Sequence, residues 1–162
     1  MLGLDIEKAG NPIRAGWNAV SRIPGGRRLF SEFIGRMAPY TGTVGARILD
    51  LEVGFCRAEM KDRRAVRNHL ESVHAIALMN FAEVCSGVGL MYGLDENTRG
   101  ILKGLQIEFL KKARGTLTAT CRFEPPQGGE RQEFLIHPEI FNEQGEMVAR
   151  ATATWLIGPK KR

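Results

Sequence analysis

One segment of this chain is apolar on almost every side of a helix, and it constrains the fold more than any other feature. It runs from about Val73 to Met91. Its apolar side chains are Val73, Ala75, Ile76, Leu78, Met79, Phe81, Val84, Val88 and Leu90. A helix that is apolar all round must be buried. Because His74, Asn80 and Glu83 interrupt the apolar stretch, we expect a buried core helix and no membrane span.

The residues after this helix alternate between apolar and polar with a period of two, as antiparallel strands do. The side chains that share one face are Leu105, Ile107 and Phe109 in one strand, Leu117, Ala119, Cys121 and Phe123 in the next, and Ala149, Ala151, Ala153 and Trp155 in the last. Arg114 and Gly115 are predicted to join the first two strands as a tight hairpin. Residues 142–145 are predicted to turn the final hairpin.

Two further strands are expected over residues 43–60, meeting near Gly54. The element order is then a helical start, two strands, one long helix and four strands. A single helix among antiparallel strands is typical of an α+β domain, and a curved sheet wrapped around the helix satisfies both patterns. We divide the chain into an N-terminal helical segment (1–40), the domain of sheet and helix (41–158) and a basic tail (159–162).

The N-terminal segment has apolar residues at helical spacing on both sides of Pro24. We predict helices that cover the sheet. The alternative is an amphipathic element on a membrane surface, since several arginines accompany the apolar positions. These are Arg14, Arg22, Arg27, Arg28 and Arg36.

The chain carries a formal net charge of +5, which favours an anionic partner. Nucleic acid is not expected, because the basic residues are scattered and aromatic residues make up only 7% of the chain. The three cysteines form no CxxC pair, which argues against disulfides and favours the cytoplasm. No group of residues has metal-ligand spacing and no nucleotide-binding motif is present, so neither a metal nor a separate cofactor is expected.

Glu83 is the only acid on the apolar helix, where Asn80 and Gly87 share its stripe. A carboxylate in such a place must be paired, hydrated or functional, because burying it alone costs several kcal/mol. Desolvation would raise its pKa toward the range useful for a general base. A structural ion pair with an arginine, or a solvent-facing groove between subunits, remains the alternative.

The start of the helix is the second candidate feature. Ser72 is the predicted N-cap, and the free N–H groups of the first turn would form a site for an oxyanion. If the Ser72 hydroxyl accepts from the Ala75 N–H, that donor is lost to a substrate. His74 lies in the same stretch, although a lone histidine is more often packed than catalytic.

The pattern Asn68-x5-His74-Ala75-x7-Glu83 resembles the hotdog-fold acyl-CoA thioesterases related to the phenylacetate-pathway thioesterase. In that family an Asn precedes a His-Gly-Gly helix start, and an Asp or Glu follows the His by nine residues. The string NHLESVHAIALMNFAE is most similar to an uncharacterised branch with His-Ala at the helix start. The likeness in element order covers about residues 40–157, whereas the motif itself covers 68–87.

The resemblance implies a hotdog fold and hydrolysis of an acyl-CoA thioester. Glu83 would be the general base or the nucleophile, Asn68 would orient the water or the thioester, and the Ala75 N–H would polarise the carbonyl. His74 belongs to the same motif. The site would lie between two subunits that supply the Asn and the acid from opposite chains, so the resemblance implies a homodimer, with a homotetramer possible.

The phosphates of CoA require cations. We predict Lys103, Lys111, Lys112 and Arg114 for this role, with Lys103 on the inward face of its strand; Arg63, Arg64 and Arg67 are the alternative patch.

Ala75 and Ile76 replace the Gly-Gly of the family, and Ile76 narrows the approach to the helix start. A non-catalytic hotdog module that binds acyl-CoA or a partner protein is therefore the second hypothesis. A hydroxyacyl-thioester dehydratase ranks third, because its His-Phe-Pro loop is absent.

Overall fold

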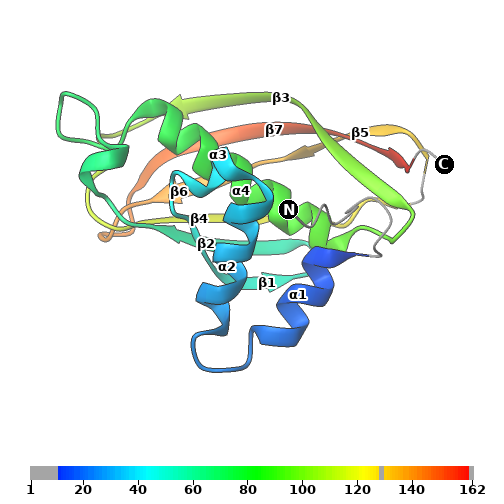
Figure 1. Cartoon of the computed structure of the whole chain (residues 1–162). Helices are drawn as coiled ribbons and strands as arrows, with labels where there is room; N and C mark the ends of the chain where they lie inside the picture. The colour runs from blue at the N-terminus through cyan, green and yellow to red at the C-terminus, as the bar shows by residue number, and fades with distance from the viewer. Residues whose placement is uncertain (1–10, 128–129, 161–162) are drawn as a thin grey trace.

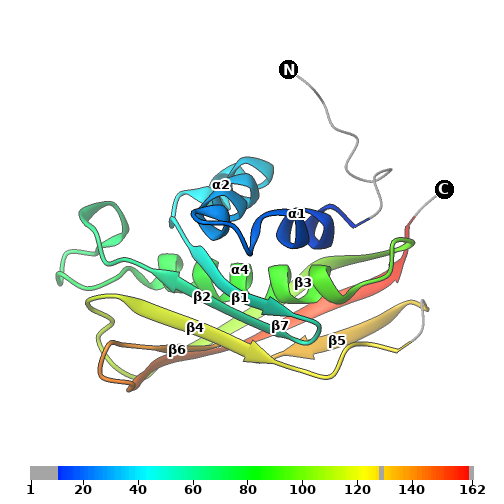
Figure 2. The ribbon, with the colours of Figure 1, turned by 90° about the horizontal axis from the view of Figure 1, so that it is seen from below.

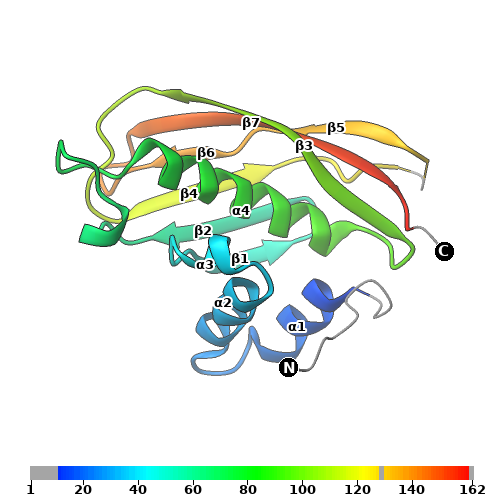
Figure 3. The same ribbon diagram turned by 45° about the horizontal axis from the view of Figure 1, so that its top comes forward.

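The long apolar helix lies across the concave face of an antiparallel sheet (Figure 1). The computed structural model describes residues 11–127 and 130–160. Helix α4 runs from Ala75 to Gly93, and Figure 3 shows the sheet curving around it. Length and composition alone would allow α4 to cross a membrane, but most of it is buried inside the protein. This is the hotdog arrangement, so the predicted α+β fold is confirmed.

Within residues 11–127 and 130–160 the sheet has seven strands, and every pairing among them is antiparallel. The strands are β1 (Arg47–Glu52), β2 (Phe55–Met60), β3 (Thr98–Phe109), β4 (Leu117–Arg122), β5 (Gln132–Ile136), β6 (Glu139–Phe141) and β7 (Met147–Pro159). Their order is β1-β2-β4-β6-β7-β3, and β5 pairs with the end of β7 beyond β6. Strands β1 and β3 therefore form the two edges.

The predicted alternation places small side chains under the helix. In β7 the side chains of Ala149, Ala151, Ala153 and Trp155 are all buried, while the residues between them are more exposed. Alanines in this row let α4 approach the sheet closely. Trp155 fills the wider space near the middle of the helix, where its ring meets Gly87.

The predicted hairpin between β3 and β4 is wrong. Strand β3 pairs with β7, from Thr98 opposite Pro159 to Phe109 opposite Ala149, whereas β4 pairs with β2 and β6. Gly115 does turn the chain, with φ at 71°. The segment that contains it instead crosses from the sheet edge to its middle. A hydrogen bond from the Val73 N–H to the Ala113 carbonyl, 2.8 Å long, ties this crossover to the helix start.

Three N-terminal helices cover the side of α4 that the sheet leaves open: α1 (Pro12–Val20), α2 (Gly26–Met37) and α3 (Pro39–Gly42). Figure 2 shows α4 between these helices and the sheet. The apolar faces of α1 and α2 join the common core, since Ile13, Trp17, Phe30 and Ile34 are buried there. These apolar faces pack against the rest of the protein. The helices therefore form a cover, as predicted, and their buried faces are not free to meet a membrane surface.

The division at residue 40 stays a prediction. Part of the predicted N-terminal segment (1–10) and the end of the predicted basic tail (161–162) lie outside the described residues.

Candidate active site

Asn68 organises the loop that leads into α4. Its Oδ1 atom accepts hydrogen bonds from the Leu70 N–H at 2.9 Å, and from the Ser72 N–H and hydroxyl, both at 3.3 Å. Arg67 and Val73 pair across the neck of this loop as an isolated β-bridge. The carbonyl half of the Asn68 amide is thus fixed by the loop, while its Nδ2 group makes no hydrogen bond with a described residue. That amide nitrogen is available as a donor.

The helix begins two residues later than predicted, because His74 and not Ser72 is its N-cap. The Nδ1 atom of His74 accepts from the Ile76 N–H at 3.1 Å. Ser72 uses its hydroxyl on Asn68 instead. The expected competition for the Ala75 N–H therefore does not occur, and within the described chain this N–H donates to no acceptor. A free donor at a helix N-terminus suits a developing negative charge.

A pocket of about 350 Å³ brings together four of the predicted site residues. Asn68 and Ala75 line it from the helix start, and Lys111 and Lys112 line it from the segment after β3. Its walls are apolar, formed by Val73, Leu78, Phe109, Leu110 and Ala113. We call this the helix-start pocket. The two lysines are 36 to 44 positions from Asn68 and Ala75 in sequence, so only the fold joins the two pairs.

His74 lines a different pocket, of about 290 Å³, on the side of Tyr40 and Asn80. Its ring is exposed. The structure therefore gives the imidazole a capping contact and places it apart from Asn68 and Ala75. A catalytic role for His74 stays a prediction.

Glu83 is half-buried, and its carboxylate makes no hydrogen bond or ion pair with a described residue. Burial raises the pKa of this carboxyl above its ordinary value of 4.5, and no nearby charge contributes to the shift. Among the described residues, an ion pair with an arginine therefore does not explain why an acid stands on this apolar helix. Eight residues of helix separate it from Ala75, a rise of about 12 Å. Within one chain the acid and the helix-start pocket are separate.

Trp155 is a neighbour of Glu83 that sequence reasoning placed on the inner face without linking it to the acid. A Cβ atom on Gly87 would lie 3.0 Å from Cη2 of Trp155 and 3.4 Å from Oε1 of Glu83. The indole Nε1 group is buried and has no acceptor among the described residues. The acid and the aromatic ring therefore both border the same position of α4, Gly87.

The predicted cations differ in what they contact. Lys103 is exposed and forms an ion pair with Glu133, so its predicted inward position is wrong. The pairing of β3 with β7 is irregular between Leu102 and Gly104, and this bulge turns Lys103 outward. Arg114 donates to the carbonyls of Leu70 and Glu71, both at 3.1 Å, and so fastens the Asn68 loop.

The two remaining lysines line the helix-start pocket, and they differ in pairing. Lys111 forms an ion pair with Glu146 at 2.5 Å, whereas Lys112 has no partner among the described residues. Of the alternative patch, Arg67 is paired with Asp62, and this contact lowers the pKa of the Asp62 carboxyl. Arg63 donates to the Thr43 carbonyl. The side chain of Arg64, like that of Lys112, has no partner among the described residues, but only Lys112 of these two lines the helix-start pocket.

The three cysteines meet in the core, which their spacing in the sequence did not reveal. Cys56 and Cys121 are opposite each other on β2 and β4, and the Sγ atoms of Cys85 and Cys121 are 3.8 Å apart. All three are buried free thiols. Hydrogen bonds with the Cys121 and Cys56 side chains, together with burial, raise the pKa of Cys85 well above its ordinary value, so it is a poor nucleophile.

Comparison with known proteins supports the fold. The model of a family described as a domain of unknown function, DUF4442, matches residues 26–157. A structural-genomics crystal structure is 26% identical, with a TM-score of 0.78 over 92% of this chain and 97% of its own. A Pseudomonas aeruginosa protein of unknown function, described as a "probable thioesterase", is 23% identical, with a TM-score of 0.73 over 85% and 97%.

A phenylacetic acid degradation-related protein from Ralstonia eutropha, described as a "putative thioesterase", is 22% identical, with a TM-score of 0.64 over 74% of this chain and 89% of its own. No curated protein sequence matches the chain significantly. The solved structures share its hotdog fold, so the resemblance to the hotdog-fold thioesterases is confirmed at the level of the fold.

Proposed function

This chain belongs to the family of the domain of unknown function DUF4442, and we propose that it hydrolyses acyl-CoA thioesters with Glu83 as general base or nucleophile. The observation that carries the proposal is the desolvated carboxylate of Glu83 on the central helix of a hotdog fold, where no described residue pairs with it. A raised carboxyl pKa brings the acid closer to neutral pH, where it accepts a proton more effectively. The structural neighbours named as thioesterases support the same class of reaction.

As general base, Glu83 takes a proton from a water molecule while the water oxygen attacks the thioester carbonyl carbon. The negative charge that develops on the carbonyl oxygen is stabilised by the Ala75 N–H. The C–S bond then breaks, and the CoA sulfur leaves with the proton, giving a carboxylic acid and free CoA thiol. The Nδ2 group of Asn68 orients the water or the thioester. No metal or further cofactor is needed for this sequence of steps.

Two chains are required if these groups act together, because Glu83 and Ala75 are about 12 Å apart along one helix. We propose a homodimer in which one subunit supplies Glu83 and the other supplies Asn68 and Ala75. Strand β3 is the edge that suits this pairing. It is twelve residues long and has an exposed apolar residue, Ile101, and such an edge is a template for a strand of another chain. A dimer of such dimers stays a prediction.

A second candidate function rests on Ile76. This side chain is 50% exposed directly after Ala75, where the related thioesterases have glycine. Ile76 lines the pocket of His74 and Asn80 and not the helix-start pocket, so the predicted narrowing of the approach stays a prediction. A module that binds acyl-CoA, or a partner protein, without turnover stays the second hypothesis. The cytoplasm stays the predicted compartment for either function, since all three cysteines are free thiols.

Release of free thiol from a panel of short, long and aromatic acyl-CoA esters tests the proposal. We expect the wild type to turn over at least one ester, and Glu83→Gln to lose about 100-fold or more of that rate. Glu52→Gln is the matched control, because Glu52 is an exposed acid on β1. Thermal stabilisation by an ester without thiol release would favour the binding module.

Mixing two inactive variants tests the shared site. Dimers of Asn68→Ala alone and of Glu83→Gln alone should be inactive. After the subunits exchange, about one quarter of the wild-type rate should return, because half of the dimers are mixed and each holds one intact site. If both residues act from the same chain, mixing restores nothing.

A further inference from the structure

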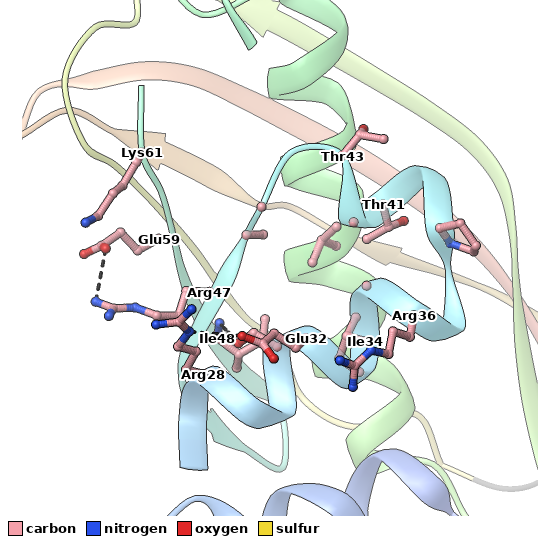
Figure 4. A pocket seen from close by; sticks show the side chains of 17 residues that line it. Arg28, Glu32, Ile34, Arg36, Thr41, Thr43, Arg47, Ile48, Glu59 and Lys61 are labelled. Carbon is pink, nitrogen blue, oxygen red and sulfur yellow. Dashed lines mark hydrogen bonds and ion pairs between the residues drawn. The ribbon is translucent and has the colours of Figure 1, made fainter. Parts of the chain in front are cut away.

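Another pocket is lined by no residue of the proposed active site, although Val84, which follows Glu83 on α4, is one of its lining residues. It has a volume of about 920 Å³ and is formed where α2 and α3 meet β1 and the end of β2 (Figure 4). Its apolar part includes the buried side chains of Ile34, Ile48 and Val84, from α2, β1 and α4. We call it the cover pocket, because the N-terminal helices close it. Its volume falls in the range of ordinary small-molecule sites.

The cover pocket carries an excess of positive charge. Its charged residues are Arg28, Glu32, Arg36, Arg47, Glu59 and Lys61. Both acids are already neutralised, by Arg28 at 3.0 Å from Glu32 and by Arg47 at 3.1 Å from Glu59. Within the described chain, Arg36 and Lys61 make no ion pair or hydrogen bond. Figure 4 shows these two cations at opposite ends of the pocket.

We propose that the cover pocket binds an amphiphilic anion, with its apolar chain on Ile34, Ile48 and Val84 and its anionic head group on Arg36 or Lys61. An uncharged ligand would leave both cations without a partner. A small inorganic anion would leave the apolar part in contact with water. A chain that bears one carboxylate or phosphate satisfies both features, because the net charge of the pocket is positive and most of its surface is apolar.

A ligand in the cover pocket would also connect the N-terminal helices to the sheet. The Ser31 hydroxyl, from α2, accepts a hydrogen bond from the Ile48 N–H at 2.9 Å, which joins the cover to strand β1 directly beside the pocket. A ligand that contacts Ile34 and Ile48 together would bridge the same two elements. Its binding therefore stabilises the cover against the sheet.

Isothermal titration calorimetry with laurate and with dodecyl phosphate, each below its micelle concentration, tests the proposal. The measurement uses the Glu83→Gln protein, so it requires no hydrolysis, and its failure is separate from a failure of the proposed function. Dodecyl maltoside supplies an uncharged head on the same chain, and inorganic phosphate supplies a head group without the chain. The laurate and dodecyl phosphate arms distinguish carboxylate from phosphate.

We expect at least one of laurate and dodecyl phosphate to bind at one site per chain. Arg36→Ala or Lys61→Ala should weaken that binding roughly fivefold to tenfold, as the loss of one charge-assisted contact does. Arg22→Ala is the matched control, since Arg22 is exposed, has no partner among the described residues and lies outside the pocket. It should leave the affinity unchanged.

Thr41→Phe places a bulky ring in the pocket and leaves all of its charged residues unchanged, so it should abolish binding. The melting temperature of the variant without ligand reports whether it folds. The proposal is overturned if both cation variants bind as tightly as Arg22→Ala. The proposal is also overturned if dodecyl maltoside binds as tightly as the anionic amphiphiles, because the anionic head group would then be unnecessary. It is overturned as well if inorganic phosphate alone binds as tightly, because the apolar chain would then be unnecessary.

Discussion

The Glu83 carboxylate and the Trp155 indole ring lie against the same backbone position, Gly87. Both come within 3.4 Å of the point where a Cβ atom on Gly87 would stand. Because glycine has no side chain, this position leaves room for both groups. Removal from water raises the pKa of a carboxyl group, because the charged form loses its hydration. Burial thus raises the pKa of the proposed catalytic acid, and Gly87 and Trp155 lie at the same place in the fold.

Gly87→Ala should destabilise the protein, because the new Cβ atom would lie 3.0 Å and 3.1 Å from two ring carbons of Trp155. We expect a loss of about 1–3 kcal/mol in the free energy of unfolding, as overpacking produces. Gly93→Ala in the same helix is the control, since its Cβ would meet only Val53 at 3.8 Å. Urea denaturation measures both. Equal stability of the two variants would contradict the close packing at Gly87.

The ionisation of Glu83 should be visible in the fluorescence of Trp155. The chain has two tryptophans, so Trp17→Phe leaves Trp155 as the only source of tryptophan fluorescence. Its emission should change with pH, with a midpoint above 4.5, because burial raises the Glu83 pKa. Glu83→Gln in the Trp17→Phe background should remove that transition. A transition that persists in the double variant would show that another group causes it.

Variants of His74 separate its capping role from catalysis. His74→Ala removes the acceptor for the Ile76 N–H and should cost about 1 kcal/mol in the free energy of unfolding. His74→Asn restores a capping acceptor and should recover most of this loss. If the imidazole only caps the helix, the Asn variant keeps thioesterase activity. Wild-type stability with lost activity in His74→Asn would instead assign the ring a part in the reaction.

Dimer formation should depend on the outer edge of the sheet. Ile101 on β3 is 50% exposed, and Ile101→Lys places a charge on the edge strand that we assign to the subunit contact. Light scattering coupled to size exclusion should show a shift toward monomer. Leu135→Lys is the matched control, because Leu135 is 51% exposed on β5. A monomeric Leu135→Lys, with Ile101→Lys still dimeric, would place the contact elsewhere.

The apolar periodicity of α4 and the alternation in β7 are local patterns, and for this reason the sequence predicts the central helix and the strand faces. The partner of a strand is not local: β3 and β4 are neighbours along the chain, yet the contact of Val73 with Ala113 draws their connection across the helix start. The predicted N-cap, Ser72, is wrong for a similar reason. Ser72 and His74 both have a suitable acceptor, and the hydrogen bonds of Asn68 decide between them.

The candidate site likewise has a part that local sequence predicts and a part that depends on the tertiary structure. The motif spacing predicted Asn68, Ala75 and Glu83, which are carried by one loop and one helix. The link between Glu83 and Trp155 joins residues 72 positions apart, and it could not be predicted without the register of β7 against α4. The bulge at Lys103 also reverses the side that simple alternation assigns to that residue.

The pH dependence of thiol release by wild type and Glu83→Gln tests the central claim most directly. The ionised carboxylate is the proton acceptor, so kcat/KM of the wild type should rise with pH and level off above a midpoint higher than 4.5. The Glu83→Gln enzyme should be about 100-fold slower or more and should lack that rise. A Glu83→Gln enzyme with the wild-type rate and the wild-type profile would contradict the account.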